Sequence, residues 1–562
     1  MADLEARQTR CTLCSLSCAL GFERTPGGSI APGDPQDVSQ LRVGICGRGH
    51  LNYELMAHPL RLGEPLLRQG GRLVPTPLAT VADAIRPALT SGRLLVVADG
   101  SLPCEDLAAS AAFASVLAAK ADWTVYQDPA DEALLTGVAA SGVAILTPEN
   151  LAECDAVLSI GDAFGTHPVI SRPVHAVRRQ DPRRAFIVID SVRTRTGKLA
   201  TTFLEVRPGT ESAVLRFLAG LETSVQQAAQ ISGLPQSQLE GVAGALGKVK
   251  RLGVLAAPEF GKAGDWEAVG ALAGLLAKRY NGGVTPLPAG GNSWGGYNVA
   301  KTLAATPLAR TIKKLIAGEY SAAVVLGVDL VAQLPLPGLG EALERLAALV
   351  VASVLRPTPA SAGTCFLPMA TNIEVCGTVV NGSGEVIELT RVTRPAGGAL
   401  SARALLEAIR PAGAESVLTG TIEPRWLKPA TETSLETCLA GKPVIVEPGD
   451  GRLTAVGESG CVHKGSGAVS MRLSWPQVFE SVPTLRVSRR DADELGLADG
   501  ATVEVASARG SARLKVVIEK GQRARQVGLW THAPEVRALF DWKESAGPWL
   551  VAGPVAVTVK KV

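Results

Sequence analysis

Short runs of aliphatic residues recur through most of the chain, at positions 94–98, 124–126, 156–160, 186–189 and 322–326. A continuous apolar run of this length is typical of a parallel strand that is buried on both faces. The Ala-rich stretch at 104–120, between the first two runs, predicts a helix. Because strands alternate with helices and end in Gly or Asp, we predict a doubly wound α/β body.

The pattern changes at about residue 443. From there the chain has short segments in which apolar and polar residues alternate between Gly-containing turns, for example 485–488, 502–506 and 514–518. This alternation is typical of half-buried strands. We therefore expect a separate β unit at the carboxy-terminal end.

The composition supports a large protein with a substantial core. At 562 residues, with 46% hydrophobic residues, the chain should form three or four units. Only 19% of residues are charged, which suggests that partner subunits cover part of the surface. The net charge is +3 and no basic run occurs, so nucleic acid is not an expected partner.

No part of the sequence predicts export or a membrane span. The first residues lack a signal-peptide hydrophobic region, and no stretch of about 18 apolar residues occurs. The expected location is the cytoplasm, with peripheral attachment to a membrane complex as the alternative. Six scattered cysteines are then expected to be small buried residues rather than disulfide partners, namely Cys104, Cys154, Cys365, Cys376, Cys438 and Cys461.

Four other cysteines form a metal motif at the amino-terminal end. Cys11, Cys14 and Cys18 lie within eight residues, and 27 residues separate Cys18 from Cys46. Structural zinc usually uses two Cys-x2-Cys pairs, whereas three local cysteines and one distant cysteine suit a 4Fe–4S cluster. We predict the cluster and keep zinc as the alternative. His50 is expected to be a surface residue or to lie behind the ligands.

The residues after Cys46 make the motif more specific. Arg48, Gly49 and the run His58-Pro-Leu-Arg-Leu62, together with the cysteines, resemble the start of the molybdopterin-dependent oxidoreductase family. Formate dehydrogenases and the iron–sulfur large subunit of NADH:quinone oxidoreductase are the most similar members. In formate dehydrogenases a Lys often lies between cluster and pterin, so Arg48 is nearer the respiratory type.

The resemblance continues at the ends of the predicted strands. Residues 160–169 resemble the family's Gly-Ser-Asn-Pro-x3-His-Pro loop, 189–194 its Asp-Pro-Arg-x-Thr loop, and 289–297 a Gly-rich loop. The resemblance implies a pterin guanine dinucleotide with Mo or W, held by Gly161, Asp162, Asp190, Arg193, Thr194, Asn292 and Arg48. The Asp190 carboxylate can accept hydrogen bonds from guanine, and Arg193 can meet a phosphate. A helix-capping Asp and a surface Arg are the structural alternative.

One expected feature of the family is missing. Active members place a Cys, selenocysteine or Ser ligand for molybdenum after the second strand, but residues 126–137 contain no Cys, Ser or His. Asp128, Asp131 or Glu132 could supply an oxygen ligand. Cys104 lies one strand earlier and is a poor substitute. No catalytic residue can be assigned.

The resemblance covers nearly the whole chain and implies three parts. These are a 4Fe–4S domain at 1–62, a two-lobed α/β body at 63–442, and a dinucleotide-binding type of β-barrel at 443–562. In the last part His463-Lys-Gly-Ser-Gly departs from the family's His-x-Gly-x-x-Thr signature.

An intact cysteine set beside an empty ligand loop favours an iron–sulfur electron-transfer subunit of a multisubunit redox complex, with iron–sulfur or flavin subunits as partners. The alternatives are an active formate dehydrogenase-type enzyme with a Mo or W bis-pterin cofactor, and a zinc-stabilised assembly subunit.

Overall fold

The computed structural model describes residues 6–27, 29–36, 38–117, 120–221, 224–358, 361–418, 423–429, 433–449, 451–544 and 547–562. The chain forms two compact units. The first comprises Met1–Gln127, Gly290–Val331 and Leu336–Ala430, and the second comprises Asp128–Ala289, Ala332–Pro335 and Thr431–Val562. In the described part of the chain, no helix has the length and apolar character needed to cross a membrane.

The first unit is built on a seven-stranded sheet. Its order is β5 (Arg72–Pro75), β4 (Leu66–Gln69), β15 (Cys365–Pro368), β14 (Ala348–Ser353), β13 (Ala322–Leu326), β6 (Leu94–Asp99) and β7 (Ala121–Tyr126). The five strands from β15 to β7 are parallel, and β4 and β5 are antiparallel additions at one edge. Of the predicted apolar runs, 94–98 and 322–326 form the adjacent inner strands β6 and β13, and 124–126 lies in the edge strand β7.

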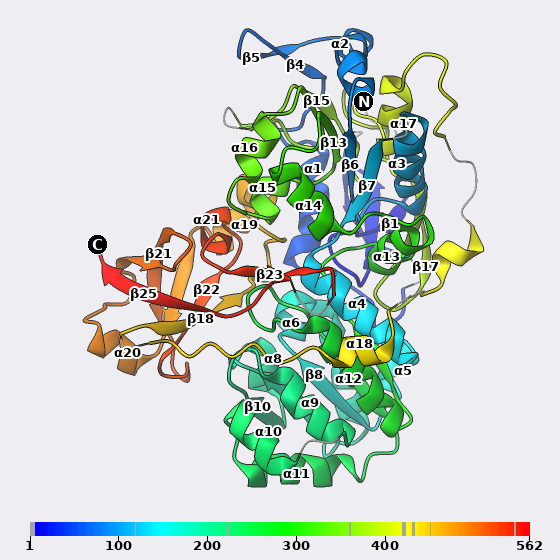
Figure 1. Ribbon diagram of the computed structural model, residues 1–562. Coiled ribbons are helices and arrows are strands. Elements are labelled where there is room, and N and C mark those ends of the chain that lie inside the picture. The colour runs from blue at the N-terminus through cyan, green and yellow to red at the C-terminus, as the bar shows by residue number, and fades with distance from the viewer. Residues whose placement is uncertain are drawn as a thin grey trace. The chain divides into compact units, whose positions relative to one another are not determined.

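Helices cover both faces of this sheet (Figure 1). On one side lie α3 (Cys104–Leu117) and α17 (Ala402–Ile409), and on the other side lie α14 (Leu308–Ile316) and α16 (Leu339–Glu344). Residues 118 and 119 of the predicted 104–120 helix lie outside the described residues. The helix α3 buries mostly Ala, Ser and Leu, and these small side chains let it pack close to β6 and β7.

The amino-terminal part of this unit is a small antiparallel sheet of β1 (Gln8–Arg10), β2 (Ala19–Arg24) and β3 (Ile30–Gly33). A 3-10 helix, η1 (Gly47–His50), leads directly into α1 (Leu51–Met56). The remaining elements of the unit are α2 (Leu78–Thr90), α13 (Ser293–Thr302), η3 (Pro424–Leu427) and the hairpin of β16 (Gly377–Val380) and β17 (Val386–Leu389).

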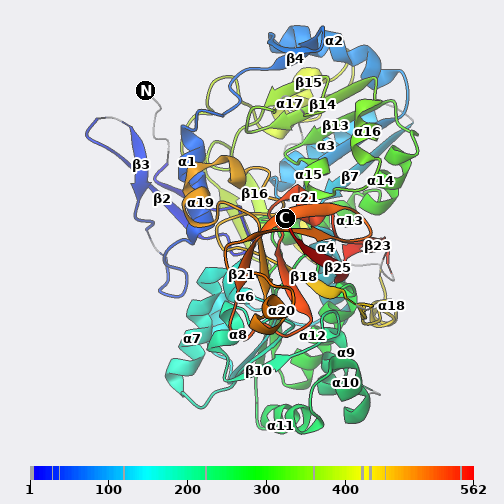
Figure 2. The same cartoon turned by 90° about the vertical axis from the view of Figure 1, so that its left-hand side faces the viewer.

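The second unit contains a five-stranded parallel sheet. Its order is β10 (Thr202–Glu205), β9 (Phe186–Asp190), β8 (Ala156–Ile160), β11 (Leu252–Ala256) and β12 (Gly283–Pro286). The chain order reverses between β8 and β11, and ligands of doubly wound sheets bind at such a reversal, beyond the carboxyl ends of the strands. The helices α7 (Ser171–Gln180) and α9 (Glu211–Ala219) lie on opposite sides of the sheet (Figure 2).

Two long helices pack tightly on this sheet. They are α4 (Pro129–Ser141), which follows β7 in the chain, and α12 (Trp266–Arg279). The shorter helices of the unit are α5 (Pro148–Ala152), α6 (Ala163–Thr166), η2 (Pro168–Ile170), α8 (Arg195–Leu199), α10 (Val225–Ser232), α11 (Gln236–Leu246), α18 (Leu435–Leu439), α19 (Ser474–Phe479), α20 (Arg489–Glu494) and α21 (Pro534–Arg537).

The second unit ends in a closed barrel. Its strands are β18 (Leu453–Glu458), β22 (Gln526–Trp530), β19 (Thr484–Val487), β21 (Ser511–Ile518), β20 (Thr502–Ala506) and β25 (Val555–Lys561), with a separate hairpin of β23 (Trp542–Glu544) and β24 (Leu550–Ala552). The predicted α/β body and carboxy-terminal barrel are therefore confirmed. The domain boundaries at 62/63 and 442/443 remain predictions.

Candidate functional site

The structure brings the four motif cysteines together in the first unit. Cys11 and Cys14 are buried, and Cys18 and Cys46 are half-buried. The loop that we call the cysteine loop (residues 11–18) is closed by the Cys11 amide, which donates to the Cys18 carbonyl at 2.9 Å. Burial and the three other thiols all raise the pKa of Cys18. Cys18 therefore lies within electrostatic range of the other three thiols.

Arg48 lies beside these thiols and is itself buried, with 5% of its surface exposed. Burial raises the pKa of Cys14 to about 12, and the Arg48 guanidinium opposes this rise. Among the described residues, the Nε and Nη2 atoms of Arg48 have no hydrogen-bond partner. A buried cation of this kind needs a negative partner, and four metal-bound thiolates would supply one. The donor set thus fits a 4Fe–4S cluster, which stays a prediction.

The cysteine loop is held by segments that are distant in sequence. Ser17 Oγ donates to the Gly291 carbonyl at 3.4 Å, and the Gly382 amide donates to the Ser15 carbonyl at 2.9 Å. A Cβ atom at Gly291 would overlap the backbone of Thr12. The Gly-rich loop before α13 therefore has a close backbone neighbour in its own chain, which is the cysteine loop.

Asn292 is fully buried and both ends of its amide are bonded inside the first unit. Its Nδ2 donates to the Leu102 carbonyl at 2.6 Å, and its Oδ1 accepts from the Val380 amide at 2.7 Å. Its neighbour Cys104 is also enclosed, and burial raises the pKa of Cys104 to about 12. The amide of Asn292 ties the loop before α3, the start of α13 and β16 together, and its role toward a cofactor stays a prediction.

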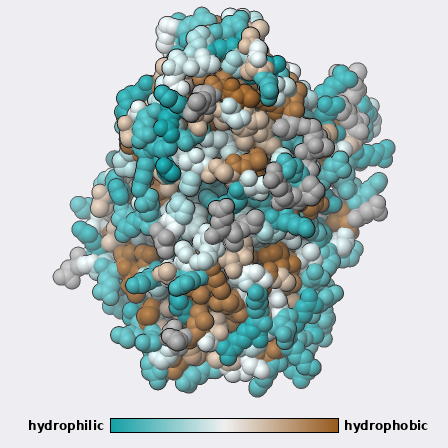
Figure 3. All heavy atoms as spheres, turned by 45° about the vertical axis from the view of Figure 1, so that its right-hand side comes forward, coloured by the Kyte–Doolittle hydropathy of each residue, from teal (hydrophilic) through white to brown (hydrophobic). Residues whose placement is uncertain are grey.

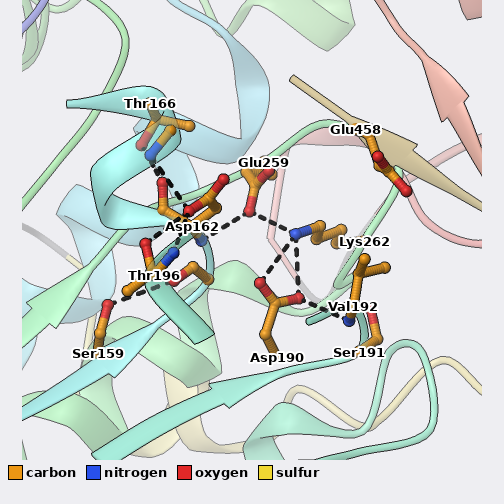
Figure 4. Close-up of polar contacts among 12 residues, drawn as sticks. Ser159, Asp162, Thr166, Asp190, Ser191, Val192, Thr196, Glu259, Lys262 and Glu458 are labelled. Carbon is orange, nitrogen blue, oxygen red and sulfur yellow. Dashed lines mark hydrogen bonds and ion pairs between the residues drawn. The ribbon is translucent and has the colours of Figure 1, made fainter. Parts of the chain in front are cut away.

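The second unit gathers four charged side chains at the reversal point of its sheet (Figure 4). We call them the strand-end cluster: Asp162 follows β8, Asp190 ends β9, and Glu259 and Lys262 follow β11. Lys262 Nζ donates to Asp190 Oδ1 at 3.0 Å, to Asp190 Oδ2 at 3.1 Å and to Glu259 Oε2 at 2.6 Å. The side chains of Asp190 and Lys262 are 0% and 2% exposed, so this is a buried ion pair.

Electrostatics in the cluster follow from this burial. Burial raises the pKa of Glu259 to about 7, although Lys262 opposes the rise. Burial also raises the pKa of Asp190, with Lys262 again opposing. Burial alone would lower the pKa of Lys262, but Asp190 and Glu259 outweigh it and hold that pKa above the usual value. The lysine is therefore charged across the physiological pH range.

Asp162 caps a helix with its side chain. Its Oδ1 accepts from the Gly165 amide at 3.2 Å, from the Thr196 amide at 3.1 Å and from Thr196 Oγ1 at 2.5 Å. Its own amide donates to Glu259 Oε2 at 2.9 Å. The carboxylate therefore caps α6 and ties it to α8.

The other predicted pterin residues lie at the edge of this cluster. Arg193 is exposed, with its guanidinium 5.7 Å from the centre of the Phe203 ring. Thr194 Oγ1 has no hydrogen-bond partner among the described residues. Gly161 has a φ of +78°, and a Cβ atom there would lie 2.5 Å from the Ala257 carbonyl oxygen. The conformation needs Gly, and the close neighbour is the protein's own backbone.

Glu259 and Lys262 were not identified from the sequence. The signal was present, because both follow the apolar run 252–256, which forms β11. Polar residues just beyond a strand belong to the same sheet edge as Asp162 and Asp190. The partner of Asp190, however, is 72 positions away, and pairing over that distance has no local signature.

The loop expected to carry a molybdenum ligand is the start of α4. Asp128 caps this helix by accepting from the Ala130 amide at 3.1 Å, and it lies 3.5 Å from Arg537 Nη2. Asp131 Oδ2 accepts from the Ala289 amide at 2.8 Å. The candidate oxygen ligands Asp128 and Asp131 therefore make structural contacts. In the described ranges, no three Cys, His, Asp or Glu side chains are grouped tightly enough for a single metal ion.

His463 is fully buried in the second unit. Its Nδ1 lies 3.0 Å from Ser470 Oγ and its Nε2 lies 2.8 Å from the Glu480 carbonyl oxygen. Its ring packs edge-on against Trp530, with the ring centres 5.0 Å apart. Both nitrogens thus have partners within the protein.

Comparisons with known proteins agree with this fold. The family described as "Molydopterin dinucleotide binding domain" matches residues 460–553. The F420-dependent formate dehydrogenase subunit alpha of Methanocaldococcus jannaschii is 27% identical over 215 residues, which are 37% of this chain and 31% of that protein. Subunit alpha of F420-dependent formate dehydrogenase 1 from Methanococcus maripaludis is 27% identical over 234 residues, 38% of this chain and 32% of that one.

Among solved structures, acetylene hydratase from Pelobacter acetylenicus has the same fold. The two share 13% identity with a TM-score of 0.73, over 99% of this chain and 100% of that one. The formate dehydrogenase matches span about a third of those relatives' length, so the similarity covers only part of each protein. The chain contains a molybdopterin dinucleotide-binding domain at residues 460–553, and the predicted resemblance to the molybdopterin oxidoreductases is confirmed in sequence and in fold.

Proposed function

We propose that the chain is an iron–sulfur electron-transfer subunit of a multisubunit redox complex, built on a molybdopterin oxidoreductase fold. The observation that carries the proposal is that Cys14 and Cys18 each lie within electrostatic range of the other motif thiols, with the buried guanidinium of Arg48 beside Cys14. When bound, a 4Fe–4S cluster takes up and returns single electrons.

The chain's own residues have two tasks in this function. The thiols would hold the cluster, and the cysteine loop that carries three of them is held by contacts with Gly291 and Gly382. Arg48 balances negative charge, and Asn52 Nδ2 lies 3.4 Å from Cys11 Sγ, where it donates a hydrogen bond to the sulfur. Positive groups and hydrogen bonds at the sulfurs favour the reduced state and so raise the reduction potential.

The loop after β7 supports a relay rather than a catalyst. It has no Cys, Ser or His, and Asp128 and Asp131 are engaged by Arg537, Ala130 and Ala289. The alternative is an active Mo or W bis-pterin enzyme of the formate dehydrogenase type. The match of residues 460–553 and the names of the two relatives favour that alternative.

Partners are part of the proposal. Both relatives are named as alpha subunits, which implies further subunits in those enzymes. Apolar side chains reach the surface of this chain, and on the face in Figure 3 hydrophobic residues lie among hydrophilic ones. Val478 and Phe479, for example, are 76% and 59% exposed. Exposed apolar residues in number are typical of surfaces that other proteins cover. We place the complex in the cytoplasm, either free or at the periphery of a membrane.

Metal content tests the proposal. The complex, purified without oxygen, should contain about four iron atoms per chain, as one cubane requires, and no molybdenum or tungsten. Cys14→Ser should lose this iron and the low-temperature EPR signal of the reduced cluster. Cys376→Ser is the matched control, because Cys376 is an exposed cysteine of the same unit, and it should keep both. Stoichiometric molybdenum or tungsten would establish the pterin alternative, and zinc without iron would establish the assembly alternative.

A further inference from the structure

The strand-end cluster occupies the place where the sequence predicts guanine recognition. We propose that Lys262 is an internal substitute for the guanine of a dinucleotide, so that the Asp190 pocket of this chain closes on its own ammonium group and takes no guanine nucleotide. The inference rests on the proposed function, since a subunit that only relays electrons needs no nucleotide at this point.

The first argument is the hydrogen-bond balance. An ammonium group has three N–H donors. Lys262 directs them at the two oxygens of Asp190 and at Glu259 Oε2, at 3.0, 3.1 and 2.6 Å. A guanine would present its own N–H donors to the same carboxylate. A carboxylate has about four acceptor positions. Lys262 and the Val192 amide, which donates to Oδ1 at 3.2 Å, occupy three of them, so Asp190 cannot also accept the pair of N–H donors of a guanine.

The second argument is space. Phosphates approach Gly-rich strand ends because the missing side chain lets the backbone come near. At Gly161 that approach is made by the Ala257 carbonyl and by Glu259, whose Oε2 would lie 3.2 Å from an added Cβ. The loops after β8 and β11 therefore pack directly on each other where a ligand would enter.

The third argument is charge. The cluster holds three carboxyl groups and one ammonium, and Glu458 of β18 lies beside it (Figure 4). A diphosphate would add negative charge to a buried site that already has an excess of acidic groups. The cation predicted to meet a phosphate, Arg193, is exposed and lies over Phe203. Among the described residues, four buried oxygens near the cluster have no hydrogen-bond partner, namely Ser191 Oγ, Thr194 Oγ1, Glu458 Oε1 and Gln526 Oε1. Ordered water commonly satisfies buried polar atoms of this kind.

Guanine content tests the inference. The complex should be purified from a host that makes molybdopterin guanine dinucleotide, and GMP released by acid should be counted per chain beside the iron. We expect less than about a tenth of a GMP per chain, the level of an unoccupied site. Stoichiometric GMP that is lost in Asp190→Asn but kept in the exposed-site control Asp181→Asn would overturn the inference. If both variants keep their GMP, the nucleotide is bound at another site, which supports closure of the Asp190 pocket. The same result would contradict the proposed function, which requires no nucleotide. Loss of iron with no GMP contradicts the proposed function alone.

A second measurement uses the unmodified protein, in case Asp190→Asn does not fold. The complex is pulsed with an acetylating reagent and each lysine is followed by mass spectrometry. Lys262, 2% exposed and paired, should react at least tenfold more slowly than Lys198, which is 57% exposed. Equal rates at the two lysines would show that the pocket opens, and would overturn the inference.

Discussion

At the scale of single residues, the least expected feature is a lysine enclosed by carboxylates. A buried charge is costly unless it is paired and hydrogen-bonded. Lys262 meets both conditions, because its three donors face Asp190 and Glu259. Loss of one partner should destabilise the protein, because the remaining charged groups would then be buried and unpaired.

Replacing this lysine should therefore cost much stability. Lys262→Met keeps the length of the side chain and removes its charge, and we expect a loss of about 3–5 kcal/mol in the free energy of unfolding. Lys198→Met is the control, because Lys198 pairs with Glu519 at a similar 2.9 Å but is exposed, and it should change stability by less than about 1 kcal/mol. Denaturant unfolding of both variants measures the difference. Equal losses of stability in the two variants would show that burial of the Lys262 ion pair does not increase its contribution.

Glu211 gives a second prediction, in the pH dependence of stability. This residue begins α9 and is fully buried, and burial raises its pKa from 4.5 to about 8, with smaller effects from Asp190, Asp265 and Lys262. The folded protein then holds a proton that the unfolded chain releases, so its stability falls as the pH rises from about 4.5 to about 8.

The variant Glu211→Gln removes this titration while keeping the shape of the side chain. Since each unit of pKa shift corresponds to about 1.4 kcal/mol, we expect the variant to gain at least that much over the native protein between pH 5 and pH 9. Melting temperatures across this range measure it. Glu259, whose pKa is about 7, contributes the same pH dependence of stability to both proteins. The prediction therefore concerns the difference in stability between the variant and the native protein. Parallel curves would contradict the prediction.

At the scale of elements, α4 and α12 of the second unit pack so closely that glycines on each helix contact the backbone of the other. A Cβ atom at Gly137 would overlap the Glu267 carbonyl, and one at Gly270 would overlap the Leu134 carbonyl. The two helices therefore touch backbone to backbone, which places α4 close beside the sheet.

Adding one methyl group at this contact should separate the helices. We expect Gly137→Ala to lower the free energy of unfolding by about 1–3 kcal/mol, the usual cost of overpacking. Gly241→Ala is the control on the exposed face of α11, where no atom lies within 4 Å of the added Cβ. It should instead stabilise the protein by about 1 kcal/mol through helix propensity. Chemical unfolding of both variants checks the opposite signs, and a stabilising Gly137→Ala would contradict the close packing.

Elements with a local sequence pattern could be predicted from the sequence, whereas contacts between distant segments could not. The runs 94–98, 156–160 and 186–189 became buried strands because their apolar character leaves them no other stable place. The cysteine spacing predicted a shared site for the four thiols, since three of them lie within eight residues. The partners of Asp190 and Asn292 could not be predicted, because Lys262 and Val380 reach them through the fold alone. Resemblance to a family assigned these residues to a cofactor, and that assignment stays a prediction.

At the scale of the whole molecule, neither unit is a continuous stretch of chain. The first unit takes its cysteine loop from the beginning of the sequence and the segments that hold it from positions near 291 and 382. Stability of the metal site is therefore a property of long-range packing and not of the motif alone.

This arrangement predicts an effect of distant glycines on the metal. Gly291→Ala should push the loop away from Thr12, at a cost of about 1–3 kcal/mol, and should reduce the iron per chain. Gly290→Ala is the matched control, because its Cβ would meet only Ser101 Oγ at an ordinary 3.5 Å, and it should keep the full iron content. Iron analysis and EPR of both variants test the contrast. Equal iron in the two would mean that the loop holds its metal without the Gly291 contact.

The packing of the cysteine loop also sets an order in time. The thiols at positions 11–18 are synthesised first, but Gly382, whose amide binds Ser15, follows 364 residues later. At ribosomal rates this interval is on the order of tens of seconds. During this interval the thiols of the nascent chain lack the segments near residues 291 and 382 that pack against the cysteine loop. Iron delivered during the interval would therefore bind to an incompletely packed site. Maturation of the metal centre is thereby tied to the completion of the polypeptide, and a ribosome that stalls before Gly382 leaves a chain unable to close over its iron.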